Sequence, residues 1–281
     1  MLKERERTST LQRVFALLAD ALRWSLHDRV SRVLVSSFVL IMLWGTHGRV
    51  DLLTLVLDGW TGPGGDPHTR ARLIAGLKWD QEWIAFGIGL LLLVVTPCLL
   101  IRFWFRESPL DYGLGLPKPG AWPFTLVSTL VLGVFAVPSM YFASRDAGMR
   151  ATYPFYREFA GLGEFARYEA GYLLFFVTIE FTFRGYLLFG LYRIQDSMTA
   201  SAPSTDMGAR GPLLFGRYSV LVSMLSYTAW HLGKPLPEQY GTLIWGLITG
   251  TLALRSGTIW HIVIVHFAMN VWLDYLIYVS L

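Results

Sequence analysis

The 281-residue chain contains a single cysteine, Cys98, which lies within an apolar run. One cysteine excludes disulfides within the chain and thiolate metal clusters. Charged residues are also scarce, at 16% of the sequence, whereas soluble domains are nearer a quarter charged. A removable signal peptide is not expected, because the first apolar run starts only near Val33 and lacks a small-residue cleavage pattern. We therefore expect the chain to be held in a membrane by its own helices.

Apolar residues make up 53% of the sequence. Several runs reach or approach the roughly 20 residues needed to cross a bilayer. We expect an all-α, polytopic transmembrane helical bundle of about seven spans, with six and eight as alternatives, in the plasma (inner) membrane. The predicted spans are 33–46, 83–105, 122–143, 171–191, 213–232, 240–254 and 258–281. The net charge of +4 does not indicate nucleic-acid binding, because Lys and Arg lie at the ends of the apolar runs, where they set orientation.

The chain divides by composition into three parts. Residues 1–31 place apolar side chains at helical spacing between arginines, which predicts an amphipathic helix on the membrane surface. A cytoplasmic helix packed on the rest of the protein is an equal alternative. Residues 33–160 hold the N-terminal spans and loops, with residues 144–169 read as a loop carrying a surface helix. Residues 171–281 form the predicted helical core.

The span 171–191 carries two charges. Glu180 and Arg184 are four residues apart and share one helix face. A charged side chain at the centre of a membrane helix costs roughly 2.5–3.5 kcal/mol on insertion scales. Two such residues in one apolar span indicate a functional site, and a structural ion pair is the alternative.

Further polar residues lie in the later spans. His261 and Asp274 fall in no motif and are interpreted as structural, whereas His231, His266 and Asn270 fall at motif spacing. His231 ends the run Ser226–His231, and His266 and Asn270 share a helix face one turn apart. Together with Glu180 they could converge inside a bundle. A buried carboxylate is a strong base, a histidine can share the proton of a water molecule, and a second histidine with an amide can donate to an oxyanion. Such a set can add water to an amide bond without a cofactor.

A metal site is the alternative use of these residues. Glu180, His231 and His266 would form a two-histidine, one-carboxylate zinc site with an open position for water. The usual helical zinc-protease signature, H-E-x-x-H, is absent from the sequence. We favour the glutamate mechanism, because Glu180 as a zinc ligand leaves no evident general base. The sequence leaves both mechanisms open.

The order and spacing of these motifs resemble those of the CPBP family (CAAX protease and bacteriocin-processing, or Abi), which are intramembrane endopeptidases. The pattern is E-x-x-x-R, then an aromatic residue four positions before a histidine, then H-x-x-x-N, each on its own late helix. The matching pairs are Glu180 and Arg184, Tyr227 and His231, and His266 and Asn270. The resemblance covers about Gly171 to the C-terminus.

The resemblance implies that Glu180 and His231 activate water and that His266 and Asn270 stabilise the oxyanion. It also implies that Arg184 holds Glu180 or a neighbour. The family's first motif usually begins with paired glutamates, and here Ile179 occupies the first of the two positions. Neighbouring helical residues point about 100° apart, so Glu180 does not simply replace the missing carboxylate. Glu238 is a candidate for the second acid.

The expected partners are a membrane-associated protein or peptide substrate and the lipid bilayer, with no nucleic acid. In this family the substrates range from prenylated CAAX tails to leader peptides and C-terminal sorting signals. Two alternatives to a protease remain. One is a non-catalytic scaffold or immunity protein with the CPBP fold, and the other is a proton-coupled transporter that uses Glu180 and the histidines as a relay.

Overall fold

The computed structural model describes residues 12, 14–21, 23, 26–47, 80–193 and 214–280, and these ranges contain helices and no strand. This confirms the all-α prediction. The long helices are α2 (Arg29–His47), α5 (Asp80–Leu90), α7 (Trp122–Ala143), α9 (Leu162–Glu180), α11 (Leu214–Trp230), α12 (Leu236–Ser256) and α13 (Trp260–Tyr278). The chain continues from α5 without a break through η1 (Leu91–Val95), α6 (Thr96–Leu99) and η2 (Leu100–Trp104), and from α9 into η4 (Phe181–Phe189). Two short helices, η3 (Pro109–Tyr112) and α8 (Ala147–Thr152), lie in connectors.

Four of the described helical segments are long and apolar enough to cross a membrane. They are Glu82–Trp104, Trp122–Ala143, Leu162–Arg193 and Trp260–Tyr278. The chain is therefore a multi-pass membrane protein with a helical bundle. The remaining predicted spans correspond to α2, α11 and α12, and their crossing of the membrane stays a prediction.

The third of these segments begins earlier than the sequence indicated. The predicted loop over 144–169 is wrong in its second half, because α9 starts at Leu162. Phe165, Tyr168 and Glu169 are buried on one face of this additional stretch of helix. Charged residues on the opposite face interrupt the apolar run, so a search for continuous apolar stretches did not predict this part of the helix.

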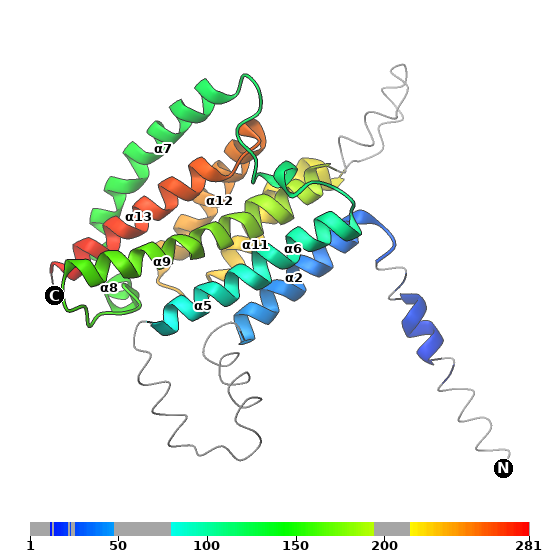
Figure 1. Ribbon diagram of the computed structural model, residues 1–281, viewed down its shortest axis with the longest axis horizontal. Helices are drawn as coiled ribbons and strands as arrows, with labels where there is room; N and C mark the ends of the chain where they lie inside the picture. The colour runs from blue at the N-terminus through cyan, green and yellow to red at the C-terminus, as the bar shows by residue number, and fades with distance from the viewer. Residues whose placement is uncertain are drawn as a thin grey trace, which may run out of the picture.

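The α9–η4 segment forms the centre of the bundle (Figure 1). α9 packs against α5 and α13, and η4 packs against α2, α11 and α12. Of the most apolar part of this segment 78% is buried within the protein, compared with 0% for α7. α7 instead lies at the edge of the bundle against α13 and α12 (Figure 1). The side chains of η4 and of the end of α9 are thus surrounded by protein.

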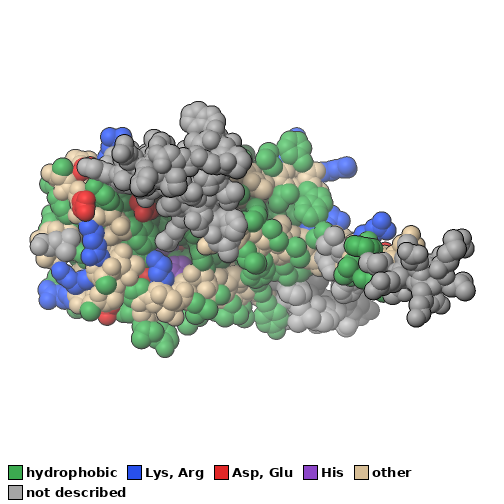
Figure 2. All heavy atoms as spheres, turned by 90° about the horizontal axis from the view of Figure 1, so that it is seen from below, with side chains coloured by type: hydrophobic (Ala, Val, Ile, Leu, Met, Phe, Trp, Pro, Cys, Tyr) green, Lys and Arg blue, Asp and Glu red, His purple; other side chains and the backbone are tan. Residues whose placement is uncertain are grey.

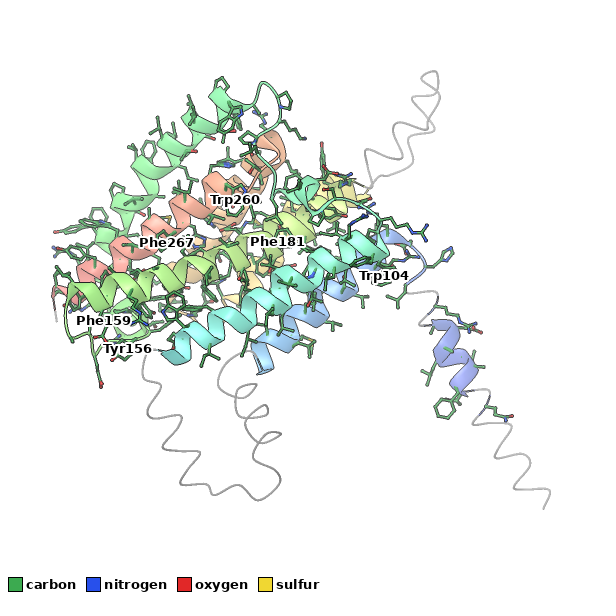
Figure 3. The ribbon with its side chains drawn as sticks, in the orientation of Figure 1. Trp104, Tyr156, Phe159, Phe181, Trp260 and Phe267 are labelled. Atoms are coloured by element: carbon green, nitrogen blue, oxygen red, sulfur yellow. The ribbon has the colours of Figure 1, made fainter. Side chains whose placement is uncertain are left out.

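Close helix approach at the centre depends on a small residue. A Cβ built on Gly171 of α9 would overlap the indole of Trp83 in α5. Any larger side chain there would push the two helices apart, since packed interiors do not absorb extra methylenes. The aromatic side chains around this contact extend along the length of the bundle. Tyr156 and Phe159 lie at its left-hand end, Trp104 at its right-hand end, and Phe181 between them (Figure 3).

The surface separates into charged and apolar regions. Charged side chains gather at the left-hand end of the molecule in Figure 2, and hydrophobic side chains dominate the surface beside them. Residues 14–21 are helical and expose Val14, Phe15, Leu17 and Leu18. Such exposure fits the predicted amphipathic helix over 1–31, and its place on a membrane surface stays a prediction because the rest of 1–25 lies largely outside the described residues.

Candidate active site

Glu180, the last residue of α9, is completely buried. Its Oε1 accepts hydrogen bonds from the indole Nε1 of Trp245 at 3.2 Å and from Nδ1 of His266 at 2.6 Å. Its Oε2 lies 3.3 Å from Nε of Arg184. The arginine therefore holds the glutamate, in agreement with the role that the resemblance implied.

Arg184 is also completely buried and makes two further contacts. Its Nε donates to Oγ1 of Thr249 at 3.1 Å, and its guanidinium carbon lies 3.9 Å from the centre of the Tyr227 ring. A cation over an aromatic face gains roughly 2 kcal/mol when both are desolvated. Glu180 and Arg184 thus form a closed cluster inside the bundle, tied to α11 and α12.

A cavity of about 380 Å³ lies beside this cluster. Its walls come from α7, α9, α11, α12 and α13. His231, His266 and Asn270, predicted from two separate motifs, all line it. Ile179 lines it as well, whereas neither Glu180 nor Arg184 is among its wall residues. The 100° step between neighbouring helical residues explains this division, because it turns Ile179 toward the cavity and Glu180 away from it.

His231 lies just past the end of α11. Its Nδ1 is 2.8 Å from the backbone carbonyl of Tyr227. A carbonyl only accepts hydrogen bonds, so Nδ1 carries a proton and Nε2 faces the rest of the site. That nitrogen lies 3.6 Å from Oε1 of Glu238. The structure therefore pairs His231 with Glu238, and pairs the predicted partner Glu180 with His266 instead.

Glu238 occupies the first turn of α12 and lines the same cavity. Its Oε1 accepts a hydrogen bond from the hydroxyl of Tyr153 at 2.8 Å. Burial and the charge of Glu238 hold the pKa of Tyr153 well above its ordinary value, so the hydroxyl keeps its proton and donates. Lys234 Nζ lies 3.4 Å from the same hydroxyl. Pro235 and Pro237 start the helix here and bring the carboxylate back toward His231.

Asn270 is oriented by a residue that the sequence reading left as structural. Its amide Nδ2 donates to Oδ2 of Asp274 at 3.1 Å, one turn along α13. The amide nitrogen has a second hydrogen available, and Asn270 lines the cavity. Asp274 thus fixes the amide so that the remaining donor can face a ligand.

Three supporting residues were not predicted from the sequence to belong to the site. Asp274 could have been found, because it repeats the four-residue spacing from His266 to Asn270 on one helix face. Trp245 and Tyr153 gave no such signal, since each reaches its carboxylate from a distant part of the chain. His261, which was read as structural, is buried outside the cavity wall.

The zinc alternative finds little support in the positions of the side chains. Among the residues that the structure describes, no group of three His, Cys, Asp or Glu side chains is placed to hold a metal ion. Glu180, the third proposed ligand, is engaged by Arg184 and Trp245 and is not on the cavity wall that both histidines line. The set of Glu180, His231 and His266 thus does not fit a shared metal site.

Comparison with known proteins gives one match. Residues 163–272 match the family model described as type II CAAX prenyl endopeptidase Rce1-like. No curated protein and no solved structure matches the chain. The matched range contains Ile179, the closed Glu180–Arg184 cluster and the polar residues of the cavity from His231 to Asn270. Residues 163–272 are thus similar to this family of CAAX endopeptidases.

Proposed function

We propose that this protein is an intramembrane endopeptidase that hydrolyses a peptide bond in a membrane-presented protein tail or peptide. One observation carries the proposal. His231, His266 and Asn270 come from two separate motifs in different parts of the chain and line one cavity, within the range that matches a family of endopeptidases. The shared cavity and the family match together favour a catalytic site over separate interhelical hydrogen bonds.

The cavity offers donors for an oxyanion. Glu180 accepts from Nδ1 of His266, which fixes the ring and leaves Nε2 as its second nitrogen. A protonated Nε2 and the free amide hydrogen of Asn270 can donate together to the carbonyl oxygen as it gains charge. Removing one such donor typically costs about 100- to 1,000-fold in kcat. In this proposal Glu180 acts through His266 as a positioning residue.

The lining of the cavity favours an apolar substrate segment. Beside the polar groups, its walls include Leu132 and Phe135 of α7 and Ile244 and Ile248 of α12. All of these except Leu132 are large side chains that also face outward, with 74% of Phe135 and 65% of Ile244 exposed. A tail that lies in the bilayer could enter between these helices with its apolar part still covered. Prenylated CAAX tails and C-terminal sorting signals both have this character.

The test uses purified full-length protein in liposomes and a panel of three internally quenched peptides. These are a farnesylated CAAX peptide, an apolar leader peptide and a C-terminal transmembrane anchor peptide. We expect cleavage of at least one peptide by the wild type and a loss of at least about 100-fold in His231→Ala and in His266→Ala. Exposed Arg255, at the far end of α12, supplies the control Arg255→Ala, which should cleave normally. Wild-type protein that cleaves none of the panel, or histidine variants that cleave normally, would contradict the proposal.

Two alternatives are separated by the same preparation. Proton-coupled flux into the liposomes without cleavage would favour a transporter, and neither activity would favour a non-catalytic scaffold. Metal analysis of the purified protein addresses the zinc mechanism. Activity that survives complete metal removal supports the cofactor-independent mechanism that we propose.

A further inference from the structure

Hydrolysis in this cavity needs a general base, and residue 179, where the resemblance expects a glutamate, does not supply one. Ile179 stands where the resemblance expects the first motif glutamate, and it faces the cavity with an aliphatic side chain. Glu180 is completely buried and engaged by Trp245, His266 and Arg184. A proton acceptor has to lie within hydrogen-bond reach of the water it activates, or one water away. Glu180 is not on the cavity wall, so a different carboxylate has to meet this condition.

Glu238 meets it. Its carboxylate lies on the cavity wall, and its Oε1 is fixed by the Tyr153 hydroxyl at 2.8 Å. Its Oε2 is buried and has no hydrogen-bond partner among the residues that the structure describes. The Glu238 side chain as a whole is 15% exposed and lines the cavity, so a water molecule in the cavity can approach it. A cavity of about 380 Å³ easily admits such a molecule.

The second partner of that water is His231. Its Nε2 lies 3.6 Å from Glu238 Oε1, so both groups border the same small volume. With Nδ1 donated to the Tyr227 carbonyl, Nε2 is the nitrogen available to the water. One carboxylate and one imidazole therefore converge on a single water position, and their orientations are fixed by Tyr153 and Tyr227.

We propose that Glu238, paired with His231, is the carboxylate that activates water in this chain, in place of the glutamate missing at Ile179. This inference rests on the proposed endopeptidase function. The carboxylate has moved from the end of α9 to the first turn of α12, while the cavity and its oxyanion donors remain in place. Glu238 is then a catalytic residue, and Tyr153 is its positioning residue.

The reaction balances with groups of this chain. The water oxygen bonds to the carbonyl carbon of the substrate while Glu238 takes one of its protons. The electron pair of the carbonyl bond moves onto oxygen, where His266 and Asn270 donate hydrogen bonds. When this intermediate collapses, the carbon–nitrogen bond breaks and the proton held by Glu238 passes to the leaving amine nitrogen. The products are a carboxylic acid and an amine.

The first experiment compares Glu238→Gln with Glu158→Gln, an exposed glutamate of the α8–α9 connector. With the peptide that the wild type cleaves, we expect Glu238→Gln to lose about 100- to 10,000-fold in kcat and Glu158→Gln to keep normal activity. The acidic limb of the kcat/KM pH profile should disappear in the residual activity of Glu238→Gln. Thermal unfolding in detergent should match the wild type in both variants. A folded Glu238→Gln variant with wild-type kcat would overturn the inference.

The second experiment moves the carboxylate. Ile179→Glu in the Glu238→Gln background returns a carboxylate to the same cavity from α9, and we expect it to recover at least tenfold of the lost kcat. Glu180 is unchanged in both variants, so it cannot account for a recovery. If the histidine variants lose activity while Glu238→Gln keeps it, only the assignment of Glu238 fails. If the histidine variants also keep it, the proposed function fails.

Discussion

Two glutamates lie beside histidines in this protein, and their surroundings differ. Glu180 has no exposed surface and is engaged by Arg184, Trp245 and His266. Glu238 has 15% of its side chain exposed and lies on the cavity wall. The first glutamate is closed off within the bundle, and the second faces a cavity.

The difference shows that the energetic cost of burying a charged residue in a membrane protein does not by itself indicate a catalytic role. A charge buried in lipid is suspicious because it is expensive, yet Glu180 compensates that expense with an arginine and two hydrogen bonds. Such a closed cluster fixes the positions of its neighbours. A catalytic carboxylate instead has to border the space in which water and substrate lie. Glu238 has that property, although nothing about its position in the sequence is costly.

The largest effect should come from opening the closed cluster. Arg184→Ala removes the cation 3.3 Å from Glu180 and leaves that carboxylate buried. Breaking a buried pair in this way lowers the free energy of unfolding by about 3–5 kcal/mol. Thermal unfolding in detergent measures the loss, and Arg255→Ala on the surface of α12 is the matched control with a change below about 0.5 kcal/mol. An Arg184→Ala protein as stable as the control would mean that the cluster is not closed.

The next effect concerns the contact between α11 and α12, which brings His231 and Glu238 together. A Cβ on Gly246 would lie 3.0 Å from the backbone Cα of Met224. Gly246→Val should therefore push the helices apart and lower the free energy of unfolding by about 1–3 kcal/mol. Cleavage should fall as well, because the distance between the two catalytic side chains depends on this contact.

Gly241 provides the control on the same helix. A Cβ added there meets nothing within 4 Å, so Gly241→Val should leave the unfolding transition nearly unchanged. Equal losses of stability in the two variants would show that the overlap with Met224 does not set the effect at Gly246. Unfolding in detergent, followed by circular dichroism, measures both.

A smaller effect is expected at Glu107, in the connector before η3. Its carboxylate binds the guanidinium of Arg29, accepts from the Tyr112 hydroxyl at 2.7 Å and lies 3.4 Å from Nε of Arg193. Partial burial alone would raise the pKa of Glu107, but the hydrogen bonds from Arg29 and Tyr112 and the nearby positive charges lower it overall. Glu107→Gln should lower the free energy of unfolding by about 1–2 kcal/mol at neutral pH and leave cleavage unchanged.

The stabilisation by Glu107 should depend on pH in a defined direction. Because the pKa of Glu107 is lower in the folded than in the unfolded protein, its stabilisation is complete above the ordinary value of 4.5 and is lost as the pH falls through the folded value. The difference in unfolding temperature between wild type and Glu107→Gln should therefore shrink below about pH 4.5. A difference that stays constant down to pH 3 would contradict the ionic origin of the effect.

The sequence indicated much of this architecture. Apolar runs located the long helices, since burial in lipid demands apolar side chains along a whole span. Two short motifs identified His231, His266 and Asn270, which line the cavity, and the four-residue spacing predicted the contact of Arg184 with Glu180. The substitution at Ile179 was visible as well, with its consequence that Glu180 points elsewhere.

The remaining features depend on how distant segments meet. Tyr153 and Glu238 are 85 positions apart, and Trp245 reaches Glu180 across 65 positions. No local periodicity encodes such contacts, because they follow from the tilt and rotation of packed helices. The early start of α9 was missed for a different reason, since its charged outer face hid an apolar inner one.

The smallest effect tests the open side of the comparison, where substrate should lie against α7. Phe135 lines the cavity and exposes 74% of its side chain, so its removal takes little from the folded protein. If a substrate covers about 50 Å² of the ring, burial at about 25 cal/mol per Å² contributes about 1 kcal/mol, or about fivefold in KM. Phe135→Ala should thus raise KM about fivefold with kcat and unfolding temperature unchanged. Leu130, 68% exposed on the same helix but away from the cavity wall, supplies the control Leu130→Ala. An equal change in both variants would place the substrate elsewhere, because only contact inside the cavity distinguishes these two side chains.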